Sequence, residues 1–460
     1  MKPLTLKTIE QVVGGRVIGA DELEKERIFV SGVASDSRKI MQGDLFVPIR
    51  GERVDGHDFI TACFEKGAIC SFSEREILPP KGKYCILVKD AQKALLELAE
   101  YYLTLFDIPV IAITGSVGKT TTKDMIASVL MQKYCVLKTE GNYNTNIGLP
   151  LMVFRIGDEH EVAVLEMGMN SFGEIHNLSK VAKPNIAVIT NIGVAHIEML
   201  GSREGILKAK SEVFDYMTPQ GVAILNGDND MLQTLEGKVS QNIIWYGIEN
   251  KRGIYAHSIY MEGLEKTRCT IHAPKGEIEV ILPVAGVHMV QNALAATAVG
   301  LQMELSLEEI KKGIETFTMT KMRMAVEHTK KGITIINDVY NANPVSMKAS
   351  LEVLAAASGR KVCILGDMGE LGIYADQMHR EVGEYAAQKG IDVIISIGEL
   401  SRHLHQGAIK DGAKNAYHYD TQEEFWQEGL SMLASGDTVL VKGSRSRGLE
   451  QTVDKIQGVN

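Results

Sequence analysis

The distribution of apolar positions predicts two series of alternating strands and helices. Short continuous apolar runs are typical of strands buried in a parallel sheet, and the first series has them at residues 110–114, 162–166, 186–190 and 222–226. The second series has strands at 333–337, 362–365, 393–397 and 438–441, and helices that begin near residues 344, 376, 400 and 423. We therefore expect an α/β protein with two doubly wound sheets.

The remaining segments complete a prediction of three domains. The N-terminal elements are a helix that ends at Gly14, strands at 44–49 and 84–88, and helices at 57–67 and 90–106. Between 243 and 283, alternating strands predict an antiparallel addition to the first sheet, and helices at 291–300 and 306–315 follow. The expected domains are a small α/β domain at 1–106, a central domain at 107–319 and a Rossmann-like domain at 320–460.

Length and composition narrow the class of protein. A chain of 460 residues is too long for one hydrophobic core and suggests roughly three domains of about 150 residues. The net charge of −9 disfavours a general nucleic-acid binder. No apolar run is long enough to span a membrane and the N-terminus lacks a signal-peptide core, so we expect a cytoplasmic protein without membrane insertion. The six scattered cysteines are expected to be reduced core residues, which implies neither zinc nor a disulfide framework.

Residues 114–122, TGSVGKTTT, have the pattern of a phosphate-binding loop between a strand and a helix over 123–132. Gly115 and Gly118 let backbone N–H groups face a polyphosphate, Lys119 can reach its outer phosphates, and Thr120 can ligate Mg²⁺. The common pattern has a glycine where this chain has Ile113, so the loop is a short variant. The alternative is a glycine turn with a solvated lysine.

Polar residues at the ends of the central strands are candidates for a metal site beside the phosphates. Glu166 ends one apolar run, His196 follows another, and Lys208 and Lys210 lie on the next helix. A carboxylate and an imidazole suit Mg²⁺ ligation, although a structural histidine and solvated lysines are the alternatives. The loop at 138–150 holds Asn142 and Asn144 and suits an oxygen-rich ligand, or is an ordinary turn cluster.

In the third domain, polar residues directly follow three of the predicted strands. Asp338, Asn341 and Asn343 follow the strand at 333–337, and Asn343 before Pro344 could also simply cap a helix. The segments at 366–372 and 442–447 follow two other strands, and the second suits an anionic ligand or a solvated loop.

In this order and spacing, the segments resemble the ATP-dependent Mur ligases of peptidoglycan synthesis over essentially the whole chain. Residues 35–38 (SDSR), 43–46 (GDLF) and 55–58 (DGHD) resemble the N-terminal domain that binds UDP-linked muramoyl peptides. Residues 340–344 (YNANP) and 366–372 (GDMGELG) look most like the members that join D-alanyl-D-alanine to UDP-N-acetylmuramoyl tripeptide. The Asp-Asn-Pro-Arg signature of the members that add the third amino acid is absent from the sequence.

The resemblance implies an acyl-phosphate reaction with ATP and Mg²⁺ as cofactors, and residue roles that follow by motif. Lys119, His196 and Lys210 are the implied catalytic residues. The implied ATP-binding residues are Gly115, Ser116, Val117, Gly118, Lys119, Thr120, Thr121, Asn292, Arg323, Asp338 and Asn341. The implied metal ligands are Thr120, Glu166, His196 and Lys210, the last as an N-carboxylysine. The implied substrate-binding residues are Ser37, Arg38, Asp55, His57, Asn142, Asn144, Asn343, Lys442, Ser444 and Arg445.

The resemblance further implies a monomer that closes its domains for catalysis. Three alternatives stay open: a Mur ligase that adds the third residue, a folylpolyglutamate synthase, and a nucleotide-dependent switch that makes no amide. The N-terminal domain disfavours the folate enzyme, and a switch would not need an acceptor site. The identity of the third peptide residue, meso-diaminopimelate or L-lysine, is left open.

Overall fold

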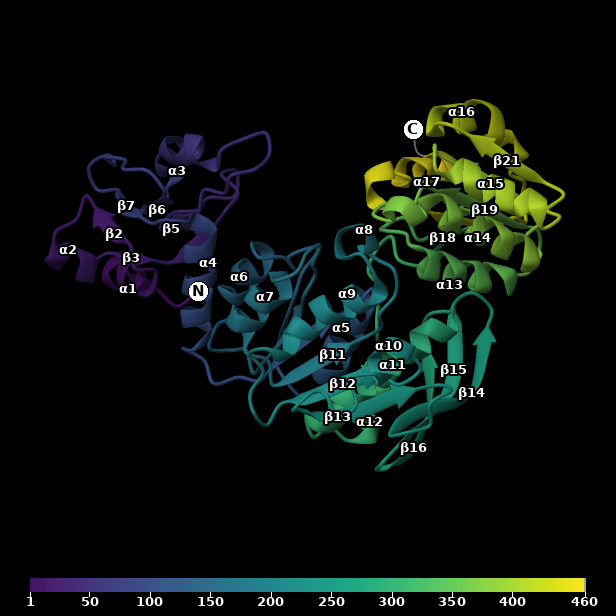
Figure 1. Cartoon of the computed structure of the whole chain (residues 1–460), viewed down its shortest axis with the longest axis horizontal. Coiled ribbons are helices and arrows are strands. Elements are labelled where there is room, and N and C mark those ends of the chain that lie inside the picture. The colour runs from purple at the N-terminus through teal and green to yellow at the C-terminus, as the bar shows by residue number, and fades with distance from the viewer. Residues whose placement is uncertain (459–460) are drawn as a thin grey trace. The chain divides into compact units, whose positions relative to one another are not determined.

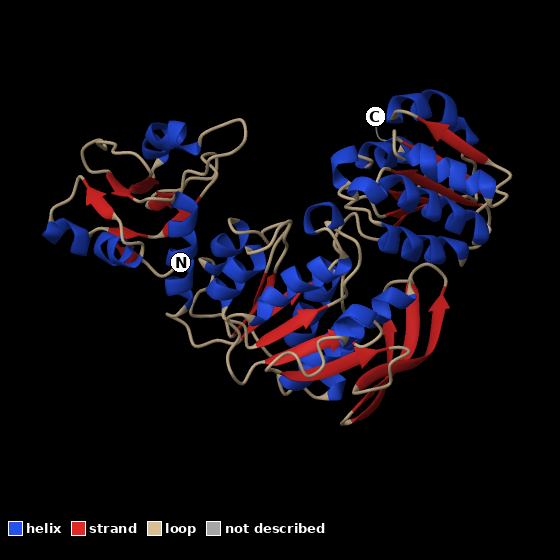
Figure 2. Cartoon of the chain, viewed as in Figure 1, coloured by secondary structure: helices blue, strands red, loops and turns tan. Residues whose placement is uncertain are grey.

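The computed structural model, drawn in Figure 1, describes residues 1–458. These residues form two compact units. The first unit is formed by Met1–Ile113, Tyr134–Ala187 and Ser211–Gly221. The second unit is formed by Thr114–Lys133, Val188–Lys210 and the described residues from Val222 onward. Parallel sheets with helices recur along the chain, which confirms the predicted α/β class (Figure 2).

The N-terminal region contains a five-stranded sheet. Its strands, in order, are β2 (Arg16–Ile18), β7 (Tyr84–Leu87), β6 (Cys70–Ser73), β5 (Asp44–Phe46) and β4 (Gly32–Ala34). Only the β2–β7 pair is antiparallel. A separate antiparallel pair joins β1 (Leu4–Thr5) to β3 (Phe29–Val30). The helical segments are α1 (Leu6–Val12), α2 (Glu22–Arg27), η1 (Gly56–Phe59), α3 (Ile60–Lys66) and α4 (Ala91–Leu103).

The central sheet has nine strands. In order they are β16 (Gly276–Leu282), β15 (Lys266–Ala273), β14 (Ile254–Glu262), β13 (Asn242–Gly247), β12 (Val222–Asn226), β11 (Ile186–Ile189), β8 (Val110–Thr114), β10 (Val162–Glu166) and β9 (Val136–Lys138). The predicted antiparallel addition is confirmed from β14 onward. It is wrong for β13, which pairs parallel with both of its neighbours.

The helices of the central region extend or confirm the predicted ones. They are α5 (Lys119–Leu130), α6 (Gly148–Val153), α7 (Glu174–Ala182), α8 (Ile197–Leu200), α9 (Arg203–Ser211), η2 (Glu212–Phe214), α10 (Asp230–Gln233), α11 (Val287–Gln302) and α12 (Leu307–Glu315). α5 begins four residues earlier than the apolar periodicity indicates, because its polar first turn belongs to the glycine loop. α12 begins after Ser306, whose side chain forms a capping box with Glu309.

The C-terminal region forms a six-stranded sheet. Its order is β17 (Ala325–His328), β18 (Thr334–Asn337), β22 (Thr438–Lys442), β19 (Lys361–Gly366), β20 (Val393–Ile397) and β21 (Ala416–Tyr419). All pairs are parallel except β17–β18. The helical segments are α13 (Pro344–Ala355), η3 (Gly372–Tyr374), α14 (Ala375–Gln388), α15 (Ser401–Lys410), α16 (Gln422–Glu424), η4 (Phe425–Gly429), η5 (Leu430–Met432), η6 (Arg445–Arg447) and α17 (Glu450–Gln457).

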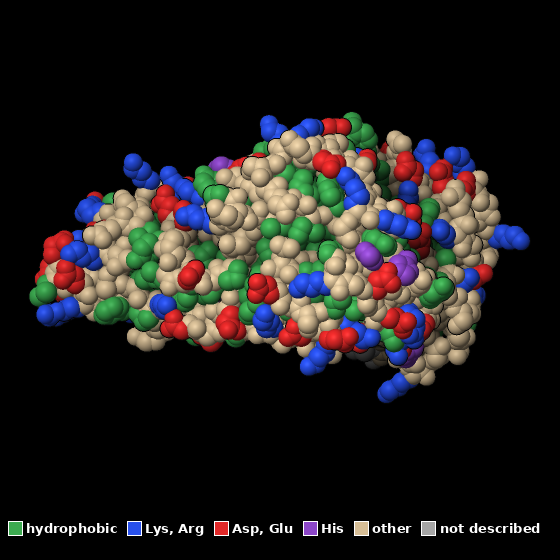
Figure 3. Space-filling model, turned by 90° about the horizontal axis from the view of Figure 1, so that it is seen from below, with side chains coloured by type: hydrophobic (Ala, Val, Ile, Leu, Met, Phe, Trp, Pro, Cys, Tyr) green, Lys and Arg blue, Asp and Glu red, His purple; other side chains and the backbone are tan. Residues whose placement is uncertain are grey.

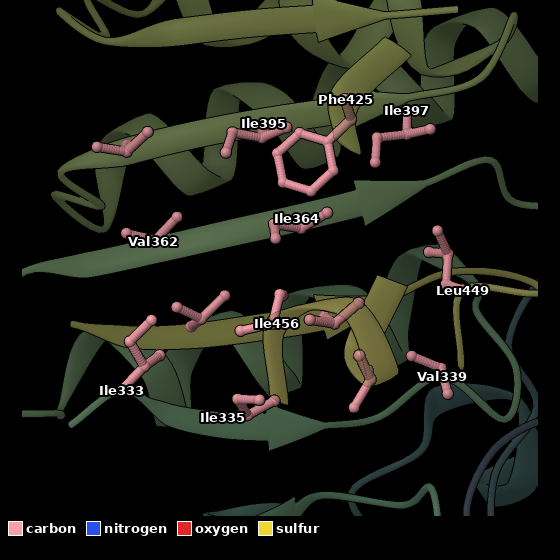
Figure 4. Close-up of a cluster of buried hydrophobic side chains, with 14 residues drawn as sticks. Ile333, Ile335, Val339, Val362, Ile364, Ile395, Ile397, Phe425, Leu449 and Ile456 are labelled. Atoms are coloured by element: carbon pink, nitrogen blue, oxygen red, sulfur yellow. The ribbon is translucent and has the colours of Figure 1, made fainter. Parts of the chain in front are cut away.

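One face of this sheet packs into a fully apolar cluster (Figure 4). Ile335, Ile364 and Ile395 come from β18, β19 and β20 and are completely buried, and Phe425 from η4 belongs to the same cluster. Burial of this much apolar surface is the main source of stability for such a sheet. The strands are thereby held in place, and the loops at their carboxyl ends are free to carry function.

The cysteines, the surface charges and the helix lengths also bear on the predicted class of protein. All six cysteines are free thiols; five are buried as predicted, and Cys135 is exposed. Acidic and basic side chains are interspersed over the face drawn in Figure 3. Among residues 1–458, none of the helices combines the length and the apolar character that a membrane crossing requires.

Candidate phosphate-binding site

The glycine loop joins β8 to α5, as its sequence predicts. Gly115 and Gly118 have φ values of +146° and +83°, which side chains rarely adopt. A Cβ atom on Gly115 would lie 1.9 Å from Oγ1 of Thr190, so no larger residue fits there. Gly118 caps α5, and the first N–H groups of that helix have no acceptor within the helix itself. The loop therefore presents a helix N-terminus suited to phosphate oxygens.

Residues that follow β11 hold the loop in this shape. The backbone N–H of Ser116 donates to the carbonyl of Asn191 at 3.0 Å, and that of Val117 donates to Asn191 Oδ1, also at 3.0 Å. Thr190 Oγ1 donates to the carbonyl of Val117 at 2.6 Å. Sequence reasoning missed Thr190 and Asn191, although their position directly after an apolar strand marks them for inspection.

Lys119 is the first residue of α5, and its ammonium lies over the loop. Its Nζ donates to the carbonyl of Gly115 at 2.8 Å. Asn292, from α11, approaches the same helix end: its Oδ1 accepts a hydrogen bond from Thr122 Oγ1 at 3.0 Å and lies 3.2 Å from where a Cβ on Gly118 would be. The structure thus brings both predicted residues to the loop.

Arg323 also reaches the loop. Its Nη2 donates to Thr120 Oγ1 at 3.0 Å, and its guanidinium carbon lies 4.1 Å from the centre of the Tyr340 ring. Met322 and Met324 on either side have φ values of 62° and 49°. Two methionines thus have the left-handed backbone that glycine adopts most easily, so the segment around Arg323 is strained.

Lys210 is the most unusual titratable residue of the chain. Its side chain is completely buried, and Nζ has no hydrogen-bond partner among the described residues. Burial lowers the pKa of Lys210 well below its ordinary value, and the charge of Lys119 lowers it further. Burial therefore favours the neutral, nucleophilic form of this amine over its charged form. Lys208, two residues earlier on α9, is exposed.

Glu166, in the first unit, ends β10 opposite Ile113, the residue that precedes Thr114 and the loop. Its Oε1 accepts a hydrogen bond from Asn144 Nδ2 at 2.8 Å, and the carboxylate is almost fully buried. Oε2 has no partner among the described residues. A buried carboxylate oxygen without a partner is costly unless a cation balances it.

His196 pairs with Glu370, a residue that sequence reasoning missed. Nδ1 of His196 lies 2.6 Å from Oε2 of Glu370. The hydrogen bond from His196 holds the pKa of Glu370 below its ordinary value. The 366–372 segment was singled out as a strand end, but nothing in the sequence indicates which of its residues faces His196. Within residues 1–458, no group of three His, Cys, Asp or Glu side chains could by itself hold a metal ion.

The predicted C-terminal residues form a network of their own. Lys442 Nζ donates to Asp338 Oδ2 at 2.5 Å and to the carbonyl of Asn341 at 3.0 Å. Asp338 Oδ1 accepts the backbone N–H of Met324 at 3.3 Å, so the network supports the segment that carries Arg323. Lys442 is buried, and its charge is balanced by the carboxylate of Asp338.

The remaining C-terminal candidates lie near the strand ends. Asn343 caps α13 through a reciprocal box with Ser346, so the alternative of a helix cap is confirmed. Ser444 Oγ accepts the backbone N–H of Gly369 at 2.8 Å. Arg445 is exposed, with Nη1 at 3.4 Å from Glu450 Oε1.

The N-terminal candidates differ in their freedom to bind a ligand. Both ring nitrogens of buried His57 are engaged: Nδ1 lies 2.6 Å from Asp55 Oδ1, and Nε2 accepts the backbone N–H of Glu74 at 3.1 Å. Arg38 is exposed and makes a two-point ion pair with Asp36, which lowers the pKa of that carboxyl. The Ser37 carbonyl accepts a hydrogen bond from Lys66 at 2.9 Å, and Asn142 is exposed.

Comparisons with known proteins extend over the whole chain. Three sequence profiles match: "Mur ligase family, catalytic domain" at residues 29–102, "Mur ligase middle domain" at 113–300 and "Mur ligase, glutamate ligase domain" at 322–445. The UDP-N-acetylmuramoyl-tripeptide–D-alanyl-D-alanine ligase of Bacillus subtilis is 40% identical, over 98% of this chain and 97% of the relative. The crystal structure of MurF from Acinetobacter baumannii is similar with a TM-score of 0.91 and 34% identity, over 100% and 99% of the two chains. The ADP complex of MurF ligase from Thermotoga maritima has a TM-score of 0.83 and 28% identity, over 93% and 97%.

Proposed function

Because the chain belongs to the Mur ligase family, we propose that it is an ATP-dependent carbon–nitrogen ligase that joins D-alanyl-D-alanine to UDP-N-acetylmuramoyl tripeptide in peptidoglycan synthesis. The observation that carries the proposal is similarity from end to end to proteins named for this activity. A ligase that adds the third amino acid is the second candidate within the family, but the named relatives favour the dipeptide ligase. A nucleotide-dependent switch would not need the N-terminal domain.

The reaction divides into two balanced steps. A carboxylate oxygen of the tripeptide attacks the γ-phosphorus of ATP, which gives an acyl phosphate and ADP. The amine of the dipeptide then attacks the acyl carbon, and collapse of the tetrahedral intermediate expels phosphate and leaves an amide. The amine loses one proton in this step.

The chain's own residues position the phosphoryl group. The loop N–H groups and Lys119 bind its oxygens and stabilise the charge that spreads over them during transfer. Arg323 brings a second cation to the loop through Thr120. Asn292 is assigned to the adenine, and Asp338 and Asn341 to the nucleotide, as the family resemblance implies.

Mg²⁺ fits the residues present. The unpartnered Oε2 of buried Glu166 needs a cation. Thr120 and His196 are assigned as further ligands because the family resemblance implies them. Bound Mg²⁺ would neutralise phosphate charge and orient the phosphates for in-line attack. Lys210 joins this set as a carbamate: its neutral amine adds to CO₂ and releases one proton, which changes a group that repels cations into one that attracts them.

We assign residues 1–106 to the UDP-muramoyl peptide, 107–319 to ATP, and 320–460 to the incoming dipeptide and to closure over the nucleotide. The N-terminal and Asn-rich loop candidates (Ser37, Arg38, Asp55, His57, Asn142 and Asn144) serve the first substrate, with His57 shaping its loop. Asn343, Lys442, Ser444 and Arg445 serve the dipeptide side, where buried Lys442 supports the loop. The enzyme is proposed to act as a cytoplasmic monomer, which light scattering of the purified protein tests for its oligomeric state.

Phosphate release tests the proposal. Purified enzyme with ATP and Mg²⁺ should release phosphate rapidly only when both the UDP-muramoyl tripeptide and D-alanyl-D-alanine are present. A reaction that requires a free amino acid and the UDP-muramoyl dipeptide would identify the third-residue ligase instead. Release that neither substrate affects would reject both ligases and favour a switch.

A further inference from the structure

The loop that follows β19 reaches His196, which precedes α8 as its N-cap. The Nδ1–Oε2 distance of 2.6 Å between His196 and Glu370 is that of a strong hydrogen bond to a carboxylate. The imidazole is mostly covered, with 19% of the side chain exposed. Glu370 lies within residues 320–460, whereas His196 lies within 107–319, so the orientation of the imidazole depends on a distant part of the sequence.

Both residues have a backbone conformation that is unfavourable for side chains. φ is 64° at His196 and 64° at Glu370. Such strain persists where the surrounding structure enforces it, often at functional sites. Around this pair the two loops pack closely: a Cβ on Gly372 would lie 3.1–3.4 Å from atoms of Glu198.

Buried polar residues fix the loop that carries Glu370. The backbone N–H of Met368 donates to His379 Nε2 at 2.9 Å, and that of Gly369 donates to Ser444 Oγ at 2.8 Å. His379 is completely buried, and its Nδ1 donates to the carbonyl of Ala375 at 2.7 Å. The Glu370 side chain is itself 57% exposed, so the pair contributes little to stability on its own, and these buried contacts hold its loop in place.

We propose that Glu370 is a positioning residue that accepts the Nδ1–H of His196, fixes this tautomer and directs the Nε2 lone pair toward a divalent cation. Histidines that bind metals commonly donate their other ring N–H to a carboxylate, and loss of that partner typically costs 10- to 100-fold in metal affinity. The inference rests on the proposed function, because it takes His196 to be a ligand of the reaction's cation. It adds to that function a contact through which the C-terminal region orients the metal ligand.

The tautomer can be read in the unmodified protein. In ¹⁵N-histidine-labelled enzyme, the His196 resonances are assigned by their loss in His196→Gln. A protonated Nδ1 and an unprotonated Nε2 are expected at neutral pH. The opposite tautomer would overturn the proposal, whatever the variants do.

Mn²⁺ binding, followed by electron paramagnetic resonance with the metal alone, gives the second readout. Glu370→Ala should lose the fixed tautomer and bind Mn²⁺ roughly 10- to 100-fold more weakly. Glu370→Gln, whose amide oxygen still accepts Nδ1–H, should keep the tautomer and lose less affinity. The matched control is Glu399→Gln, an exposed carboxylate after the neighbouring strand β20, which should match the wild type.

The role of Glu370 and the proposed ligase activity would be rejected by different results. Unchanged tautomer and Mn²⁺ affinity in Glu370→Ala would overturn the role of Glu370 while wild-type ligation stands. Wild-type enzyme that releases phosphate without either peptide substrate would instead reject the ligase. If Glu370→Ala does not fold, the wild-type tautomer and the Glu370→Gln affinity decide.

Discussion

Arg323 donates a hydrogen bond from Nη2 to Thr120 Oγ1 at 3.0 Å, which ties the segment before β17 to the first turn of α5. The guanidinium carbon lies 4.1 Å from the centre of the Tyr340 ring, and the two flanking methionines are in the left-handed region. A cation is thus brought to the phosphate-binding loop from outside it. The contact supports the proposal that the C-terminal region takes part in nucleotide binding.

Replacement of Arg323 should weaken ATP binding more than it slows chemistry. A hydrogen bond to a charged group contributes about 1.5–3 kcal/mol, so Arg323→Ala should raise the KM for ATP by roughly 10- to 100-fold. Steady-state phosphate release at saturating peptide substrates measures this. Arg252→Ala, which removes a partly exposed arginine that stacks on Trp245, is the control and should leave KM unchanged. An unaltered KM in Arg323→Ala would show that the arginine does not serve the nucleotide.

Lys119 should act on the transfer step itself. Lys119→Met keeps the length of the side chain and removes the charge, so turnover should fall by about 10²- to 10³-fold, as for the loss of one donor to a developing anion. Single-turnover phosphate release measures the step. Lys133→Met, just after the end of the same helix, should retain wild-type turnover. Equal rates in the two variants would reject the role of Lys119.

Lys210 should be needed as a carbamate and not as a cation. Lys210→Ala leaves a cavity in the buried site, so turnover should be lost and partly restored by a short-chain carboxylic acid that supplies the missing anion. Exposed Lys208→Ala is the matched control and should remain active without the acid. Full activity of Lys210→Ala in acid-free buffer would contradict the carbamate.

The strands were predictable because their signal is local. A run of four apolar residues before a polar one, as in Val110–Thr114 or Val162–Glu166, has few alternatives to a buried strand. The parallel pairing of β13 was missed because its residue pattern is that of a partly exposed strand, which does not distinguish its neighbours. The glycine loop was predictable because the same few residues supply both the groups that bind phosphate and the glycines that its backbone conformation requires.

The partners of the site residues were not predictable, because they come from distant parts of the chain. Lys442 and Asp338 are 104 residues apart, and only the parallel pairing of β18 with β22 brings them together. Lys210 and Lys208 look alike in sequence, and only the packing of α9 separates a buried amine from a solvated one. Nothing in the sequence around Glu370 predicts its contact with His196.

His379 should make stability depend on pH. Burial lowers the pKa of His379 below its ordinary value of 6.5, so the unfolded chain binds a proton that the folded one does not. Unfolding free energy should therefore decrease as pH falls below about 6.5 and level off once pH is below the folded-state pKa. Protonation of Nε2 would also remove the acceptor for Met368.

Urea unfolding at pH 8 and pH 5.5 measures this effect. Trp426 packs against the C-terminal core, so its fluorescence in a Trp245→Phe background reports on that region. His379→Gln should cost about 1–3 kcal/mol at pH 8 and less at pH 5.5. Partly exposed His257→Gln is the control and should cost little at either pH. A penalty for His379→Gln that does not change with pH would contradict the account.

Transfer of ¹⁸O tests most directly whether this chain forms an amide through an acyl phosphate. The tripeptide is labelled with ¹⁸O in both oxygens of the reacting carboxylate and incubated with enzyme, ATP, Mg²⁺ and D-alanyl-D-alanine. One ¹⁸O should appear in the released phosphate, and one should remain in the amide of the ligated product, as mass spectrometry of both shows. Phosphate without ¹⁸O would contradict the acyl-phosphate route, and the absence of the amide product would contradict the ligase.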